Sequence, residues 1–141
     1  MRKTTLLGPL ILTLALCGCV QQPAGTPAAA SAPAISMTTD RSVYFERETM
    51  VVNISVIVPT DMNVTLDISG IKSSRGNYVL SEQREVNLRA FQPKNVSASY
   101  TLPSCSACAG ISPGNYNISA RLLQGNKALA ECNATITLMK R

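Results

Sequence analysis

The residues of this chain best suited to chemistry are its five cysteines. The chain contains no histidine. Because histidine is the usual acid–base group at neutral pH and the commonest metal ligand, Ser-His-Asp and Cys-His hydrolysis and histidine-based metal sites are excluded for this chain acting alone. We therefore predict no catalytic residue, no metal site and no cofactor, and the cysteines have to be interpreted by their spacing.

Cys105 and Cys108 form a Cys-x-x-Cys motif in a loop rich in Pro, Ser, Ala and Gly. A thioredoxin-like redox pair needs this motif at the start of a helix, whose N-terminus lowers the thiol pKa. Here the motif lies between two predicted strands, so we favour a loop-closing Cys105–Cys108 disulfide with Cys132 as a buried thiol. A bridge from Cys132 to either partner stays open, because strand parity does not give a distance. A three-cysteine metal site is the weaker alternative.

The remaining cysteines lie where an N-terminal leader, residues 1–18, ends: Cys17 is within the leader, and Cys19 directly follows it. "MRK" is a basic start, and "LLGPLILTLAL" is too short to span a membrane but fits the apolar region of a signal peptide. The following "LCGC" resembles the lipobox of prokaryotic lipoproteins. The resemblance implies cleavage between Gly18 and Cys19 and a diacylglycerol-type lipid on the Cys19 thiol. We expect an extracytoplasmic protein held by this anchor at the outer face of the cytoplasmic membrane.

Residues 19–35 follow the leader and differ from the rest of the chain. The segment "VQQPAGTPAAASAPAI" has no apolar periodicity and carries three prolines. Such composition is typical of a disordered tether, since it offers no apolar face that joins a core. We expect it to hold a folded domain, residues 36–139, away from the membrane.

From residue 36 onward apolar and polar residues alternate with period two. The clearest segments are 50–58, 62–69, 95–102, 116–122 and 128–138, and weaker candidates are 34–39 and 77–88. Alternation with β-branched residues, broken by turns such as "SSRGN" and "SPGN", predicts half-buried antiparallel strands. The expected fold is all-β: a single antiparallel β-sandwich of about seven strands.

Two stretches resemble immunoglobulin-like and fibronectin-III-like domains. "ISPGNYNISARL" is similar to the entry into their next-to-last strand, which implies that Tyr116 is a tyrosine-corner residue whose hydroxyl returns to nearby backbone. "DRSVYFERETMVVNISV" resembles the opening of archaeal and bacterial surface immunoglobulin-like repeats, with Arg47 at the position that usually holds Gly. The resemblance implies an immunoglobulin-like fold and no particular function.

Five N-x-S/T motifs begin at asparagines of the predicted outward parity: Asn53, Asn63, Asn95, Asn117 and Asn133. A glycan must face solvent, so these asparagines are glycosylation candidates. Exposed strand faces also favour Asn, Ser and Thr for their polarity alone, and this second interpretation stays open. Glycosylation at these positions would favour an archaeal source.

The charged residues do not point to a binding or catalytic site. The net charge of +5 comes from scattered basic residues, so no nucleic-acid partner is predicted. Glu46 and Glu48, like Glu82 and Glu85, look like solvated charges beside arginines rather than a two-carboxylate site. No small-molecule substrate is indicated.

The sequence as a whole predicts a prokaryotic surface lipoprotein. We expect a non-enzymatic binding or structural module of the cell envelope, either an accessory subunit of another envelope protein or part of a surface coat. The alternative is a thiol–disulfide redox protein that uses Cys105 and Cys108. A weaker idea is an inhibitor or chaperone that offers an edge strand.

Overall fold

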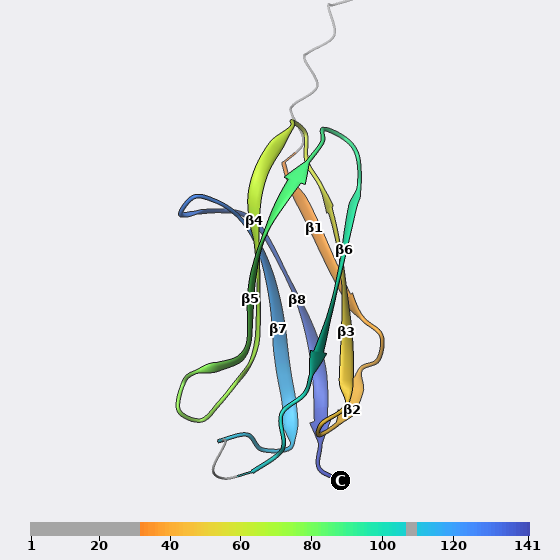
Figure 1. Ribbon diagram of the computed structural model, residues 1–141, viewed down its shortest axis with the longest axis vertical. Helices are drawn as coiled ribbons and strands as arrows, with labels where there is room; N and C mark the ends of the chain where they lie inside the picture. Colours follow the sequence, from red (N-terminus) through yellow and green to blue (C-terminus); the bar gives the residue numbers. More distant parts are fainter. Residues whose placement is uncertain (1–31, 107–109) are drawn as a thin grey trace, which may run out of the picture.

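The computed structural model describes residues 32–106 and 110–141, and these residues form eight strands and no helix. The strands build two sheets packed face to face (Figure 1), which confirms the predicted all-β sandwich. None of the described residues belongs to a helix suited to crossing a membrane. The predicted leader and Cys19 lie outside the described residues.

The smaller sheet has three antiparallel strands in the order β1-β3-β6. They are β1 (Ala34–Thr39), β3 (Thr49–Ile57) and β6 (Lys94–Thr101). Strand β1 pairs with β3 from Ala34 onward, so its first two residues lie in the range assigned above to the tether.

The larger sheet has five strands in the order β2-β8-β7-β4-β5. Their bounds are β2 (Val43–Phe45), β8 (Lys127–Met139), β7 (Gly114–Gln124), β4 (Met62–Lys72) and β5 (Tyr78–Leu88). Between β1 and β2 the chain crosses from one sheet to the other, and β2 then pairs with β8 in parallel. The prediction of a purely antiparallel sandwich was therefore wrong at this one edge, because a three-residue strand is too short to show a sequence period.

The core follows the predicted alternation in most strands. In β3 the inward residues Met50, Val52, Ile54 and Val56 are all buried. The prediction for the start of β8 was wrong: Ala128 is exposed. A bulge between Leu122 and Leu123 shifts the register there, and the β7–β8 hairpin projects beyond the sandwich (Figure 1).

Arg47 and Phe91 are two non-glycine residues with positive φ at opposite ends of the sandwich. Arg47, in the turn from β2 to β3, has φ 65°, and Phe91, between β5 and β6, has φ 57°. This region is sterically costly for residues with a Cβ, so glycine usually fills it. Arg47 therefore has the left-handed backbone that glycine adopts most easily.

Candidate functional site

Cys105 lies in a loop that is fastened to the turn between β2 and β3. Its backbone N–H donates to Oε2 of Glu46 over 2.7 Å, and Nε of Arg47 donates to Oγ of Ser104 over 2.9 Å. The thiol is buried and free. Burial, followed by the charge of Glu46, raises the pKa of the Cys105 thiol, whereas a reactive thiol needs a lowered pKa. Cys108 lies outside the described residues, so the Cys105–Cys108 disulfide stays a prediction.

Cys132 is the second free thiol among the described residues. It lies in β8 opposite Ala120 of β7 and is half-buried. Burial, and then the charge of Glu131, raises the pKa of this thiol as well. The structure places no bond between Cys105 and Cys132, and the pairing of the cysteines stays a prediction. In the part of the chain that the structure describes, no three Cys, Asp or Glu side chains come together to hold a metal ion.

All five asparagines of the N-x-S/T motifs are exposed on the outer faces of the sheets. In the smaller sheet two of the motifs face each other in antiparallel register: Asn53 is opposite Ser97, and Ser55 is opposite Asn95. The Ser97 hydroxyl donates to Oδ1 of Asn53 over 2.6 Å. The serine of one motif therefore bonds the asparagine of the other.

The larger sheet repeats this reciprocal arrangement between β7 and β8. Asn117 is opposite Thr135, and Ser119 is opposite Asn133. The Thr135 hydroxyl donates to Oδ1 of Asn117 over 3.0 Å, and the Ser119 hydroxyl donates to Oδ1 of Asn133. Cross-strand hydrogen bonds of this kind stabilise a sheet.

One further pair shows that this bonding does not depend on the glycosylation motif. Oδ1 of Asn115 accepts from the Thr137 hydroxyl over 2.8 Å, although Asn115 begins no N-x-S/T motif. Hydrogen bonding between side chains on the outer face is thus a second explanation for the abundance of Asn, Ser and Thr there. Asn63 is different, because its opposite residue is Asn87 and no hydroxyl faces it.

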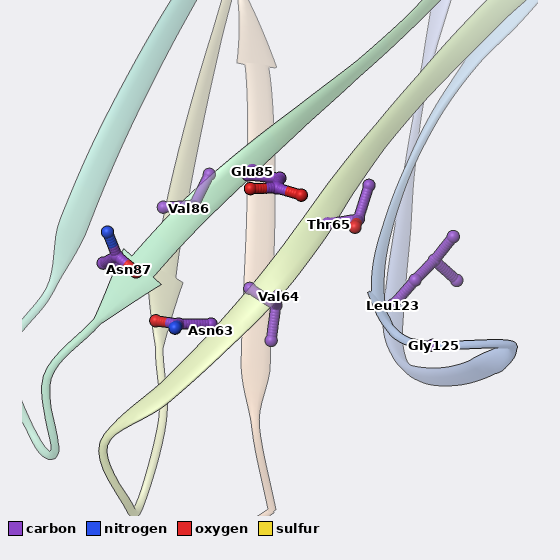
Figure 2. Close-up of a pocket in the computed structure, with 8 residues that line it drawn as sticks. All are labelled: Asn63, Val64, Thr65, Glu85, Val86, Asn87, Leu123 and Gly125. Carbon is purple, nitrogen blue, oxygen red and sulfur yellow. The ribbon is translucent and has the colours of Figure 1, made fainter.

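Asn63 also lines a hollow of about 290 Å³. Figure 2 shows it on the outer face of β4 and β5, beside the β7–β8 hairpin. Its lining residues are Asn63, Val64, Thr65, Glu85, Val86, Asn87, Leu123 and Gly125. The hollow offers amide and hydroxyl hydrogen bonds and a single carboxylate. This lining fits a polar ligand that is bound by hydrogen bonds, and its one carboxylate has no second carboxyl group beside it for a two-carboxylate mechanism.

Asp67 is the one buried carboxylate of the described residues. Nε and Nη2 of Arg121 donate to its Oδ2 over 3.1 and 2.6 Å, and Nε2 of Gln83 donates to its Oδ1 over 3.2 Å. These three residues come from β4, β7 and β5, so they join three adjacent strands. Both carboxylate oxygens of Asp67 accept hydrogen bonds, so Asp67 stabilises the larger sheet.

The side of the sandwich between β5 and β6 is closed by polar contacts. The Tyr100 hydroxyl donates to Oε2 of Glu82 over 2.7 Å, and Arg84 forms an ion pair with Oε1. The bond from Tyr100, and then Arg84, lowers the pKa of Glu82, while burial raises the pKa of Tyr100. Inward charges of this kind protect an edge strand from pairing with another chain. Glu82 is therefore engaged in contacts with Tyr100 and Arg84 instead of being the solvated charge that was predicted, while Glu85 lines the hollow.

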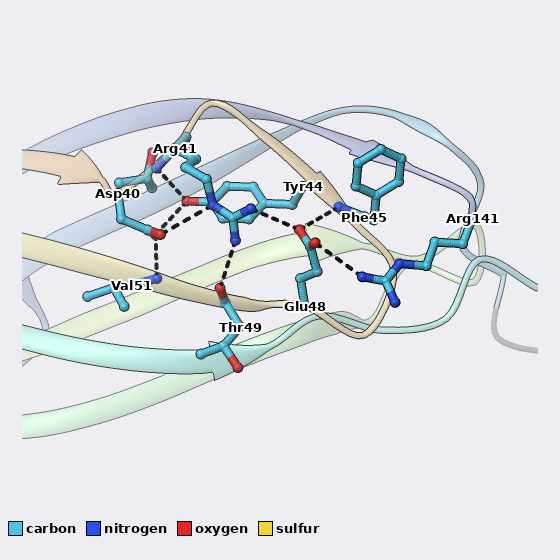
Figure 3. Close-up of polar contacts among 9 residues, drawn as sticks. Asp40, Arg41, Tyr44, Phe45, Glu48, Thr49, Val51 and Arg141 are labelled. Atoms are coloured by element: carbon cyan, nitrogen blue, oxygen red, sulfur yellow. Dashed lines mark hydrogen bonds and ion pairs between the residues drawn. The ribbon is translucent and has the colours of Figure 1, made fainter.

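A polar network, which we call the clamp, fastens the end of the sandwich opposite to the entry of the chain (Figure 3). Tyr44 is fully buried, and its hydroxyl donates to Oδ1 of Asp40 over 2.7 Å. The N–H of Val51 donates to the same oxygen over 2.7 Å, and the N–H of Arg41 donates to the Tyr44 hydroxyl over 2.9 Å. The bonds from Tyr44 and Val51, in that order, lower the pKa of Asp40.

Glu48 completes the clamp. Its Oε2 accepts the N–H of Phe45 over 3.0 Å and pairs with Nη1 of Arg41 at 3.2 Å, and its Oε1 pairs with Arg141 at 3.4 Å. The bond from Phe45, followed by the two arginine charges, lowers the pKa of Glu48. The crossover from β1 to β2 and the end of β8 are thus tied to one carboxylate. Glu46 and Glu48 act separately, since Glu46 holds the Cys105 loop.

Tyr116 lies at the start of β7, where the resemblance places a tyrosine corner. Its hydroxyl donates to the carbonyl oxygen of Ser112 over 2.6 Å and accepts the Ser112 N–H over 3.2 Å. Both bonds return to backbone four residues upstream, so the side chain fixes the loop that enters β7.

Comparison with known proteins gives a fold and no family. No family model matches the chain, and no curated protein sequence matches it. The C-terminal domain of Wzt superimposes with a TM-score of 0.59 at 10% identity, over 78% of this chain and 75% of that one. Its likeness shows the sandwich fold alone.

Two further solved structures contain this fold within larger proteins. The sporulation control protein Spo0M from Bacillus subtilis matches with a TM-score of 0.57 at 14% identity, over 77% of this chain and 49% of its own. A β-glucosidase from Listeria innocua, in complex with gluconolactone, matches with a TM-score of 0.53 at 13% identity, over 75% of this chain and 16% of its own. The chain thus spans about half the length of the sporulation protein and a small part of the glucosidase.

Proposed function

We propose that this protein is a lipid-anchored, extracytoplasmic and non-enzymatic module of the cell envelope. It serves as an accessory subunit of another envelope protein or as part of a surface coat. The observation that carries the proposal is the "LCGC" motif, followed by a low-complexity segment that leads to β1 at one end of a closed sandwich. Cys19 is the residue that carries the lipid.

The fold that we propose for the domain is immunoglobulin-like, of the fibronectin-III kind. Supporting evidence is the division of strands into a β1-β3-β6 sheet and a β2-β8-β7-β4-β5 sheet. The first strand switches sheets between β1 and β2, and the Tyr116 hydroxyl returns to Ser112. Such sandwiches carry many unrelated functions, so the fold adds no activity to the proposal.

The ionisable groups support a non-enzymatic role. The perturbed carboxylates, those of Asp40, Glu48 and Glu82, have lowered pKa values and are engaged in bonds that hold strands and turns together. The two described thiols have raised pKa values. A carboxylic acid that donates a proton at neutral pH needs a raised pKa, and a nucleophilic thiol needs a lowered pKa. The redox alternative that uses Cys105 and Cys108 therefore has no supporting observation among the described residues.

The experiment that tests the anchor is fractionation of cells that express the full chain or its Cys19→Ala variant. We expect the unaltered protein to partition into detergent with the membranes and the variant to lose its lipid and appear in the soluble fraction after processing. Cys132→Ala is the matched control, since it removes a cysteine that the lipobox does not contain. Equal membrane retention of all three proteins without a lipid on Cys19 would overturn the proposal.

The role in the envelope is tested by capture of the lipidated protein from native membranes in mild detergent. Mass spectrometry of the captured material distinguishes the two forms of the proposal. A stoichiometric envelope protein identifies an accessory subunit. A glycosylated protein that is captured alone identifies a coat or spacer component.

A further inference from the structure

The end of the sandwich at which the chain enters β1 carries an unusual loop between β5 and β6. We call this the tether end and define it by Ala34, Ile57, Val58 and the loop residues 89–93. Ala34 pairs with Ile57, and the N–H of Phe91 donates to the carbonyl oxygen of Val58 over 2.8 Å. The start of the described domain and the tip of this loop therefore lie together at the top of Figure 1.

Phe91 is the most exposed large apolar side chain of the described residues, at 66%. Single exposed apolar residues are common and need no explanation by themselves. Phe91, however, also has φ 57°, a conformation that costs a bulky residue about 1–2 kcal/mol. A smaller residue or glycine would remove the apolar exposure, and glycine would remove the strain. The presence of phenylalanine at a position that is both strained and exposed indicates a use for its ring.

The loop is held firmly enough to present that ring. The Ala90 N–H donates to Oδ1 of Asp61 over 2.7 Å, and the Gln92 N–H donates to the Arg89 carbonyl oxygen over 3.2 Å. Arg89 and Lys94, on either side of Phe91, are exposed. The Phe91 ring is therefore exposed on a loop whose ends carry the exposed cations Arg89 and Lys94, with the Asp61 carboxylate bound to the loop backbone.

We infer that the tether end lies against the bilayer surface, with the Phe91 ring in the headgroup region and Arg89 and Lys94 beside anionic lipid headgroups. This inference rests on the proposed lipid anchor at Cys19. An aromatic ring with flanking cations is suited to this boundary, because apolar burial and attraction to anionic lipids add together.

The length of the connecting chain makes the contact attainable. Fourteen residues, 20–33, separate Cys19 from Ala34. A chain of that length spans about 20 Å as a random coil and about 45 Å when fully extended as polyproline II. The anchor thus keeps the tether end within a small distance of the bilayer. At the high effective concentration of lipid that results, the weak binding of one aromatic ring is sufficient to form the contact.

The test uses the absence of tryptophan from the chain. Phe91→Trp places one fluorophore at the tether end, and Tyr78→Trp places one at the opposite end, where Tyr78 is 54% exposed. Each full-length lipidated protein is reconstituted into vesicles of phosphatidylcholine and phosphatidylglycerol, with and without brominated acyl chains. We expect brominated lipid to quench the Phe91→Trp emission and shift it to shorter wavelength, with no change for Tyr78→Trp.

The outcomes separate this inference from the anchor. Flotation of both proteins with the vesicles, together with equal quenching at the two positions, would overturn the inference and leave the anchor intact. Failure of both proteins to float would overturn the anchor and the inference together. A second measurement adds Lys94→Glu to Phe91→Trp. We expect this change to reduce the quenching in vesicles that contain phosphatidylglycerol and to have little effect in phosphatidylcholine alone.

Discussion

The two ends of the sandwich use their side chains in different ways. At the clamp, Tyr44 is fully buried and Asp40 and Glu48 each accept several hydrogen bonds or ion pairs. At the tether end, backbone groups and Asp61 hold the loop, and Phe91 projects with 66% of its surface exposed. The difference indicates that the clamp maintains the fold and that the tether end is available to contact something outside it.

Arg47 and Phe91 make this comparison at the level of single residues. Both have positive φ, and in both cases glycine would relieve the strain. The Arg47 side chain is used within the protein, since it bonds Ser104 and fastens the Cys105 loop. The Phe91 side chain extends into solvent. The strained residue thus makes an internal side-chain bond at Arg47, whereas at Phe91 it is the backbone N–H that bonds internally, to Val58.

The largest expected effect is the replacement of the central residue of the clamp. Tyr44→Ala removes a fully buried aromatic ring and leaves Asp40 without its hydroxyl donor, so we expect the free energy of unfolding to fall by about 3–5 kcal/mol. Phe91→Ala is the matched change at the tether end, and we expect no measurable loss there. Denaturant unfolding of the two variants beside the unaltered protein gives the comparison.

Tyr44→Phe separates the ring from the hydroxyl. It keeps the packing and removes only the bond to Asp40, so the expected loss is about 1–2 kcal/mol. Comparable losses for Tyr44→Ala and Phe91→Ala would contradict the assignment of different roles to the two ends.

The second prediction concerns acid sensitivity, which we assign to the clamp. The pKa values of Asp40 and Glu48 are lowered from ordinary values of 3.8 and 4.5, because their charged forms accept hydrogen bonds in the folded state. Stability from these groups is therefore present above those ordinary values and is lost as pH falls through the lowered pKa values. We expect the melting temperature to fall steeply below pH 4.5.

Asp40→Asn supplies the control for this acid dependence. The variant should be less stable at neutral pH and should lose less stability on acidification, since one of the titrating groups is gone. Phe91→Ala should keep the pH profile of the unaltered protein. An unchanged profile in Asp40→Asn would show that the acid sensitivity comes from elsewhere in the chain.

The sequence predicted the sandwich because period two is visible wherever a strand has one buried face. Strand β3 shows this, with its inward residues from Met50 to Val56 all buried. Strand β5 was only a weak candidate, because inward positions at a sheet edge are partly open and here hold Glu82 and Arg84. Strand β2 has three residues and was missed, since its parallel pairing with β8 leaves no local signal.

The hydrogen bonds and ion pairs between side chains were harder to predict from the sequence than the strands. Asp40 follows β1 and Tyr44 lies in β2, four residues later, and only the crossover between sheets shows that the hydroxyl meets the carboxylate. Asp67 bonds Arg121 across 54 residues of sequence, a pairing that alternation does not specify. The reciprocal N-x-S/T pairs depend on strand register, which follows from turn geometry and packing rather than from the motif itself.

The third prediction uses Arg47 and Phe91, two of the non-glycine residues with positive φ. Phe91→Gly relieves the backbone strain, while the added freedom of glycine in the unfolded chain offsets part of the gain, so we expect a stabilisation of about 0.5–1 kcal/mol. Arg47→Gly gains the same relief and loses the bond to Ser104, so its net effect should be smaller. Denaturant unfolding measures both. A destabilised Phe91→Gly variant would show that the ring supports the fold, and it would weaken the functional interpretation of the tether end.

The smallest expected effect concerns the asparagines of the N-x-S/T motifs. In protein from a host without N-glycosylation, Asn117→Ala removes the acceptor of the Thr135 hydroxyl and should cost about 0.2–1 kcal/mol, because the bond is an exposed cross-strand pair. Asn63, which lies one residue into β4 and therefore toward the tether end, faces Asn87 and no hydroxyl, so Asn63→Ala should leave stability unchanged.

The comparison of these two variants decides why the motifs are there. If only Asn117→Ala loses stability, cross-strand bonding is sufficient to explain the motif at Asn117. The motif at Asn63 would then have no structural role, and glycosylation would be its better explanation. If neither variant loses stability, cross-strand bonding does not explain the motifs. Glycosylation would then be the better account of both motifs, and intact-mass measurement of the native protein would be expected to show more than one glycan.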